Sequence, residues 1–137
     1  MKKAIFALSV LTLVFASCKK DNKDEPVTPT KENLTGSYRL TAFTVTFSGS
    51  TVDLFNMMDA CQKDDIYKLN ADNSYVVDDA GIVCSPSNEY TGDWSLVNST
   101  TINIDGDVGT IKSWNGKTLV VEGTDSGNTY SQTYVKQ

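Results

Sequence analysis

From residue 34 onward, short runs of β-branched and aromatic residues alternate with turns rich in Gly, Asn, Asp and Ser. Within these runs apolar and polar side chains follow a period of two, which is typical of strands that bury one face. Residues 51–62 are the exception, because their apolar side chains recur at helical spacing, and there we expect one short helix or an irregular loop. We predict eight strands, at residues 36–48, 65–70, 74–79, 89–97, 100–105, 109–114, 117–122 and 129–136.

The turns between the later strands are brief, which indicates consecutive antiparallel hairpins. Asn115 and Gly116 predict a two-residue type I′ turn. Eight strands in about a hundred residues favour closure into a small antiparallel up-and-down β-barrel, because closure removes exposed strand edges. The fold class is therefore all-β, with the short helical segment after the first strand covering one end of the barrel. A two-sheet β-sandwich is the alternative.

The first 17 residues follow a different pattern. Two lysines precede a predominantly apolar run of 13 residues, which is too short to span a bilayer comfortably and is followed at once by polar sequence. We predict a lipoprotein signal peptide over residues 1–17. The alternative is an ordinary secretory signal peptide. The end of this segment resembles a bacterial lipobox, with Phe15 where Leu is more usual. Cleavage before Cys18 would leave its thiol to carry a diacylglyceryl group, and acylation of the new amino terminus, for example with palmitate, would complete a stable anchor.

Residues 18–33 are charged and contain two prolines and almost no apolar side chains. We predict a flexible tether here, followed by one domain over residues 34–137. The lysine-then-acidic start of this tether also resembles the stretch after the lipidated cysteine of Bacteroidota lipoproteins. That resemblance implies a bacterial outer-membrane protein displayed on the cell surface, whereas a solvated spacer explains the same composition.

Charge and histidine content exclude several functions. Without residues 1–17 the chain has 10 Lys and Arg against 17 Asp and Glu, a net charge of −7, which disfavours nucleic acid and anionic lipid surfaces. The chain contains no histidine, which removes Ser-His-Asp and Cys-His catalysis and His-based metal sites. We expect no enzyme, no cofactor and no nucleic-acid partner.

Residues 70–73, Asn-Ala-Asp-Asn, fit a type I turn followed by a left-handed residue at position 73. If residue 70 closes against residue 74, Tyr67 lies opposite Val77 and Leu69 lies opposite Tyr75. These four side chains share one face and form aromatic and β-branched cross-strand pairs. We expect that face to point into the barrel.

The same register places Asp65 opposite Asp79 at the base of this hairpin. Like charges directly opposite each other repel, so the pair needs either surrounding water or a cation between the carboxylates. No calcium-loop spacing accompanies it, and a water-facing acidic rim is the favoured interpretation. We favour no metal, with a cation site at Asp65 and Asp79 as the alternative.

Cys61 and Cys84 lie just outside that base. Once Cys18 is lipidated they form an even pair in an exported domain, which indicates one disulfide. A catalytic redox pair is disfavoured, because the spacing is not Cys-x-x-Cys and the chain has no histidine to lower a thiol pKa.

Three segments resemble a known family. Residues 34–43 look like its first strand, with Tyr38 where Trp is usual; residues 61–84 look like its cysteine-bracketed hairpin; and residues 91–96 look like its second glycine-tryptophan strand, with Trp94 kept. Together they resemble the lipocalin-like domain of Bacteroidota lipoproteins. The resemblance implies a barrel and, by analogy of fold, a small apolar molecule inside it.

We therefore expect a monomeric, membrane-anchored protein that binds a small, partly apolar molecule. Trp94 has a second interpretation, which we favour, as a plug for the barrel floor. An eight-stranded barrel of short strands can also be filled by its own side chains, and a non-enzymatic surface interaction or structural module is then the alternative. The candidate ligand-lining residues are Tyr38, Leu40, Tyr67, Leu69, Tyr75, Val77, Trp94, Ile102, Leu119 and Tyr134.

Overall fold

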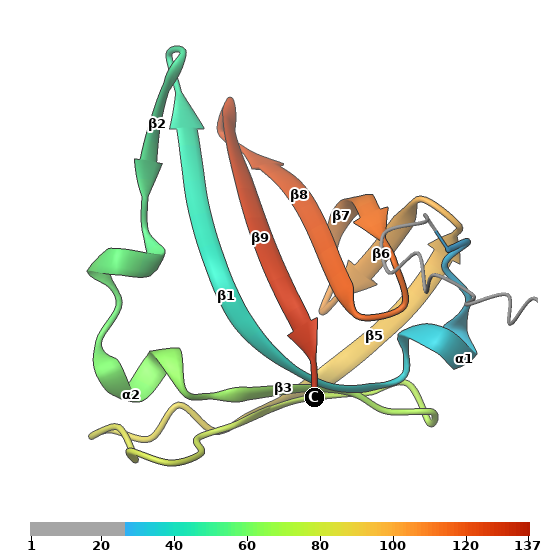
Figure 1. Ribbon diagram of the computed structural model, residues 1–137, viewed down its shortest axis with the longest axis horizontal. Coiled ribbons are helices and arrows are strands. Elements are labelled where there is room, and N and C mark those ends of the chain that lie inside the picture. Colours follow the sequence, from blue (N-terminus) through green and yellow to red (C-terminus); the bar gives the residue numbers. More distant parts are fainter. Residues whose placement is uncertain (1–26) are drawn as a thin grey trace, which may run out of the picture.

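The computed structural model describes residues 27–137 and shows one antiparallel sheet that closes on itself (Figure 1). The predicted signal peptide and Cys18 lie outside the described residues. The strands are β1 (Gly36–Phe47), β2 (Ser50–Asp53), β3 (Ile66–Leu69), β4 (Ser74–Asp78), β5 (Tyr90–Asn98), β6 (Thr101–Ile104), β7 (Asp107–Trp114), β8 (Thr118–Asp125) and β9 (Asn128–Lys136).

Closure of the sheet is made by β1. From β3 to β9 each strand pairs with the next, and β1 pairs with both β3 and β9. The ring therefore contains eight strands, and β2 is an extra strand that pairs with the last four residues of β1. Figure 1 shows β2 beside β1, on the side away from β9. The predicted eight-stranded antiparallel barrel is confirmed.

Residues 51–62, where we predicted one short helix or an irregular loop, form a strand, a 3₁₀ turn and a short helix. Ser48 and Gly49 both adopt positive φ and turn the chain back, so that β2 pairs with β1. A single 3₁₀ turn, η1 (Phe55–Met57), and the short helix α2 (Ala60–Lys63) follow. The apolar residues whose spacing suggested one helix thus belong to a strand, a 3₁₀ turn and a short α-helix.

The turn between β7 and β8 also differs from prediction. Gly116 has positive φ but Asn115 does not, and a type I′ turn requires both. The Asn115 side chain instead accepts hydrogen bonds from the backbone N–H groups of Lys117 and Thr118. Two-residue turns with positive φ at both positions occur at Ser48-Gly49, Asp105-Gly106 and Ser126-Gly127.

The hairpin of β3 and β4 follows the predicted register. Asn73 adopts positive φ, Tyr67 pairs with Val77, and Leu69 pairs with Tyr75. On the outer face of the same hairpin, Lys68 and Asp78 form an ion pair of 2.6 Å.

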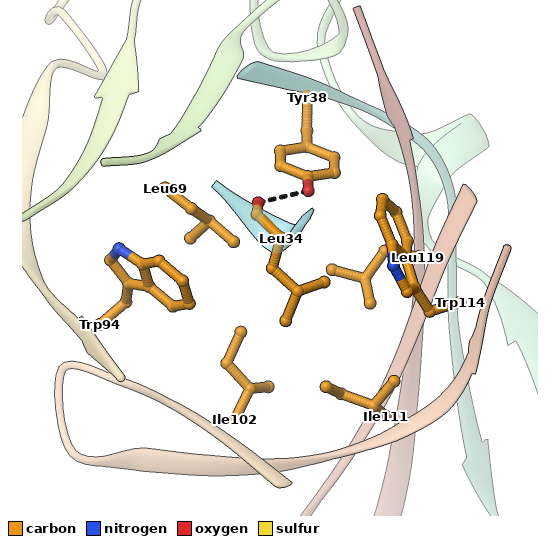
Figure 2. Close-up of a cluster of buried hydrophobic side chains, with 8 residues drawn as sticks. All are labelled: Leu34, Tyr38, Leu69, Trp94, Ile102, Ile111, Trp114 and Leu119. Carbon is orange, nitrogen blue, oxygen red and sulfur yellow. Dashed lines mark hydrogen bonds between the residues drawn. The ribbon is translucent and has the colours of Figure 1, made fainter. Parts of the chain in front are cut away.

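One end of the barrel is closed by a hydrophobic core. The short helix α1 (Lys31–Leu34), whose first three residues fall within the range expected to be a tether, supplies Leu34 to its centre. The N-cap Thr30 accepts a hydrogen bond from the Asn33 N–H, and the Val27 N–H donates to the Trp114 carbonyl, so this segment is attached to the barrel. Figure 2 shows the core residues: Leu34, Tyr38, Leu69, Trp94, Ile102, Ile111, Trp114 and Leu119. None of the helices within residues 27–137 is long and apolar enough to cross a membrane.

Candidate ligand-binding site

The inner face of β8, β9 and β1 is built in rows, because directly paired residues of antiparallel strands point to the same side of a sheet. A bulge in β1 between Leu40 and Ala42 shifts its alternation by one residue, so that Phe43 shares a face with Leu40. From the closed end outward, the rows are Leu119–Tyr134–Leu40, then Val121–Gln132–Phe43, then Gly123–Tyr130–Val45.

The facing wall comes from β3, β4 and β6. It presents Tyr67, Tyr75, Ile102 and Ile104 to the same space. The rings of Tyr67 and Tyr134 meet edge to face across that space, with their centroids 5.3 Å apart. The interior is thus apolar and aromatic at its inner end.

These walls enclose a cavity that widens away from the core. Its inner part holds only about 40 Å³. It continues into an open mouth of about 300 Å³, whose wall includes Phe43, Asp107, Gly109, Gly123 and Tyr130. Small-molecule sites begin at roughly this size, so the mouth has room for a small ligand whereas the inner part holds only a narrow group.

Two glycines of the mouth have opposite surroundings. A Cβ atom at Gly109 would lie 2.6 Å from Cγ1 of Val121, so this glycine allows β7 and β8 to approach each other closely. A Cβ atom at Gly123 would meet nothing within 4 Å. Gly123 therefore leaves open space in the wall of the mouth.

Three tyrosine hydroxyls supply polarity inside the cavity. The hydroxyl of Tyr38 donates to the Leu34 carbonyl in the core, but those of Tyr67, Tyr75 and Tyr134 have no hydrogen-bond partner among residues 27–137. Burial, with a smaller contribution from Asp65, raises the pKa of Tyr67 to about 12. Burial likewise raises the pKa of Tyr75 and of Tyr134. At neutral pH all three are protonated, and each can donate a hydrogen bond to a ligand and accept one from it.

The structure places seven of the ten predicted lining residues in the cavity wall: Tyr38, Tyr67, Leu69, Tyr75, Ile102, Leu119 and Tyr134. The other three lie elsewhere. Trp94 is buried in the core at the closed end, where its indole N–H donates to the Asn70 carbonyl at 2.8 Å, as a floor plug would. Leu40 is buried on the inner face without forming part of the cavity wall, and Val77 lines a separate surface hollow with Tyr90.

Sequence reasoning missed several residues of the wall: Phe43, Ile104, Val121, Tyr130 and Gln132. Gln132 and Tyr130 lie two and four residues before Tyr134 on β9, so strict alternation along that strand could have identified them. Phe43 carried no such signal, because the bulge in β1 breaks the alternation from Tyr38.

The predicted water-facing acidic rim is wrong. Asp65 is 3% exposed and Asp79 is 8% exposed. Asp79 accepts hydrogen bonds from the backbone N–H groups of Cys84 and Asn88, both at 3.0 Å, and Asp65 accepts one from the Asn88 side chain at 3.2 Å. The two carboxylates are buried because they hold the loop between β4 and β5.

The predicted disulfide is confirmed. Cys61 on α2 is bonded to Cys84 in that loop, with their Cα atoms 5.3 Å apart. The Asp64 carboxylate accepts the Ile82 N–H at 2.8 Å and so fastens the same loop. Over residues 27–137, no three Asp, Glu, Cys or His side chains are grouped so that they could hold a metal ion.

A closed eight-stranded antiparallel barrel, with one end filled by its core and the other open on an apolar, tyrosine-lined cavity, defines a barrel of the ligand-binding lipocalin type. The profile of the lipocalin-like domain family matches residues 34–121, which is more than half of the chain. The chain belongs to this family. Comparisons with curated proteins and with solved structures gave no significant match.

Proposed function

We propose that this protein binds a small, partly apolar molecule in the open end of its barrel and catalyses no reaction. In this proposal the barrel acts as a monomer at the bacterial outer membrane, held by the lipid on Cys18 and presented to the outside of the cell. The observation that carries the proposal is the cavity itself, which has an apolar inner end and a mouth of about 300 Å³.

The polar groups of the cavity support binding over mere filling of the barrel. In the core the hydroxyl of Tyr38 donates to the Leu34 carbonyl, whereas the indole N–H of Trp114 is buried without a partner among the described residues. The hydroxyls of Tyr67, Tyr75 and Tyr134 converge on the cavity without a protein partner among residues 27–137. A few convergent polar groups in an apolar cavity are the usual means of orienting a small ligand.

Native mass spectrometry of the protein purified from its own host tests the proposal. Gly123→Phe should occlude the mouth, because the position faces open space, and Gly123→Ala is the matched control that leaves the mouth open. We expect the wild type and Gly123→Ala to carry an additional small mass that solvent extraction removes, and Gly123→Phe to have lost most of it.

A clean protein mass for the wild type at several purification stringencies would contradict this proposal. A small mass bound equally by all three proteins would place the bound molecule outside the mouth and would also contradict it. The circular-dichroism melting curve of each variant shows whether the barrel is folded.

A further inference from the structure

One carboxylate, that of Asp107, lines the mouth of the cavity, and a second, that of Asp125, lines an adjoining outer groove. Asp107 begins β7 opposite the lining residue Ile104, and it forms part of the wall of the mouth. Asp125 ends β8 two residues beyond Gly123 and therefore points to the same side as that glycine. Both aspartates line the outer groove that shares Tyr130 with the mouth.

Cationic side chains are absent from the walls of the cavity and of this groove, among the described residues. Lys68 is paired with Asp78, and Lys112 is paired with Glu122. Lys136 lies at the closed end, where it donates to the Asn33 carbonyl. The remaining described cations, all outside these walls, are Lys31, Arg39, Lys63 and Lys117.

The same walls are rich in aromatic rings. Phe43 and Tyr130 lie at the mouth with their ring centroids 6.3 Å apart, and Tyr67, Tyr75 and Tyr134 lie further in. The negative face of an aromatic ring attracts a cation, most strongly where water is excluded. Nearby carboxylates add to this field. Burial raises the pKa of Tyr67 with a smaller contribution from Asp65, and burial raises the pKa of Tyr75 with smaller contributions from Tyr67 and then Asp105.

We propose that the cavity selects an organic cation, namely an amine or quaternary ammonium group attached to an apolar body. The apolar body enters the narrow inner end, and the cation stays at the mouth among the aromatic faces, near Asp107 and Asp125. This inference rests on the proposed function and specifies its ligand class. An anionic amphiphile such as a fatty acid would place its carboxylate against these two aspartates with no cation in the wall to offset the repulsion.

Isothermal titration with three probes that share a ten-carbon phenylbutyl skeleton tests the charge selection: phenylbutylamine, phenylbutanol and phenylbutyrate. At low ionic strength we expect the amine to bind at least about 10-fold more tightly than the carboxylate, with the alcohol between them. Added salt should narrow the difference, because the groups at the mouth are exposed to solvent.

Two double variants separate a local effect from the net charge of the protein. Asp107→Asn with Asp125→Asn should remove most of the preference for the amine and leave the affinity for phenylbutanol within about 2-fold. Glu32→Gln with Asp72→Asn changes the net charge equally, but at α1 and at the turn between β3 and β4, and should keep the preference.

The outcomes distinguish this inference from the proposed function. If phenylbutyrate or phenylbutanol binds as tightly as the amine, or if both double variants lose the preference equally, the selection for a cation is overturned while binding in the cavity stands. If none of the three probes binds, both the inference and the proposed function are contradicted.

Discussion

Asp65 and Asp79 lie opposite each other at the base of the β3–β4 hairpin, yet their surroundings shift their pKa values in opposite directions. Burial raises the pKa of Asp65, one of whose carboxylate oxygens is buried without a hydrogen-bond partner. Hydrogen bonds from the backbone N–H groups of Cys84 and Asn88 lower the pKa of Asp79, against the opposing effect of burial. The ionised form is therefore disfavoured at Asp65 and favoured at Asp79.

Replacing each aspartate by asparagine should change stability with opposite signs at neutral pH. Asp79→Asn should lower the free energy of unfolding, because the amide NH₂ that replaces one carboxylate oxygen would face a backbone N–H donor that the oxygen accepts from in the wild type. Asp65→Asn should raise it or leave it unchanged, because the amide oxygen can still accept from Asn88 and a buried charge is removed. Urea unfolding at matched pH measures both effects.

The pH dependence follows from the directions of the two shifts. The stabilisation by Asp79 is present above its unfolded pKa of about 4 and is lost as the pH falls through its lower folded value. The cost of ionised Asp65 is absent at about pH 3 and grows as the pH rises through its raised folded pKa. The difference in unfolding free energy between each variant and the wild type should therefore shrink towards acid pH. A difference that stays constant from about pH 3 to about pH 7 would contradict this account.

Single residues were predictable from sequence where local pattern alone places them. The register of the β3–β4 hairpin and the positive φ of Asn73 follow from four turn residues and strict alternation. The burial of Asp65 and Asp79 could not be predicted in this way, because it depends on the loop at residues 84–88, which folds back and supplies N–H donors. The sequence gives no local signal for that return.

At the scale of elements, the loop between β4 and β5 depends on the disulfide that connects it to α2. Cys61 and Cys84 are separated by 23 positions, so the bond restricts a sizeable loop of the unfolded chain. On the chain-entropy model such a bond contributes about 3 kcal/mol. Neither cysteine lines the cavity, so this bond supports the fold and not the site.

The double variant Cys61→Ala with Cys84→Ala should therefore lose about 3 kcal/mol of unfolding free energy and keep its ligand affinity. Denaturant unfolding and titration with phenylbutylamine measure the two quantities. A matched comparison with the reduced wild type separates loss of the bond from loss of the sulfur atoms. A loss of affinity above about 10-fold in a protein that is still folded would contradict the purely structural role.

Two features of the β1–β2 hairpin were missed by sequence reasoning. Short β2 and the inward position of Phe43 arise where β1 bulges and then turns back through Ser48 and Gly49. A bulge adds one residue and reverses which positions face inward, so the alternation before it cannot be extended beyond it. Strands without such an interruption, such as β3, β4 and β9, were placed within one or two residues.

At the scale of the whole molecule, the two ends of the barrel have different tasks. The end closed by α1 contains Trp94 and Trp114, both 2% exposed, and gives the fold its core. The other end lacks such a plug and keeps the tyrosine-lined cavity open. Core and cavity share side chains where they meet, namely Tyr38, Leu69, Ile102 and Leu119, and under the proposed function a ligand should perturb the open end more than the closed end.

Ring-resolved nuclear magnetic resonance during titration with phenylbutylamine tests this central claim most directly. We expect the ring resonances of Phe43, Tyr67, Tyr130 and Tyr134 to shift together with one dissociation constant, because these rings line the cavity. The indole N–H of Trp94 is hydrogen-bonded to Asn70 in the closed end. Its resonance should shift no more than it does in a control titration without the amine. Shifts confined to outer-face residues, or no shift at saturating amine, would contradict a binding site inside the barrel.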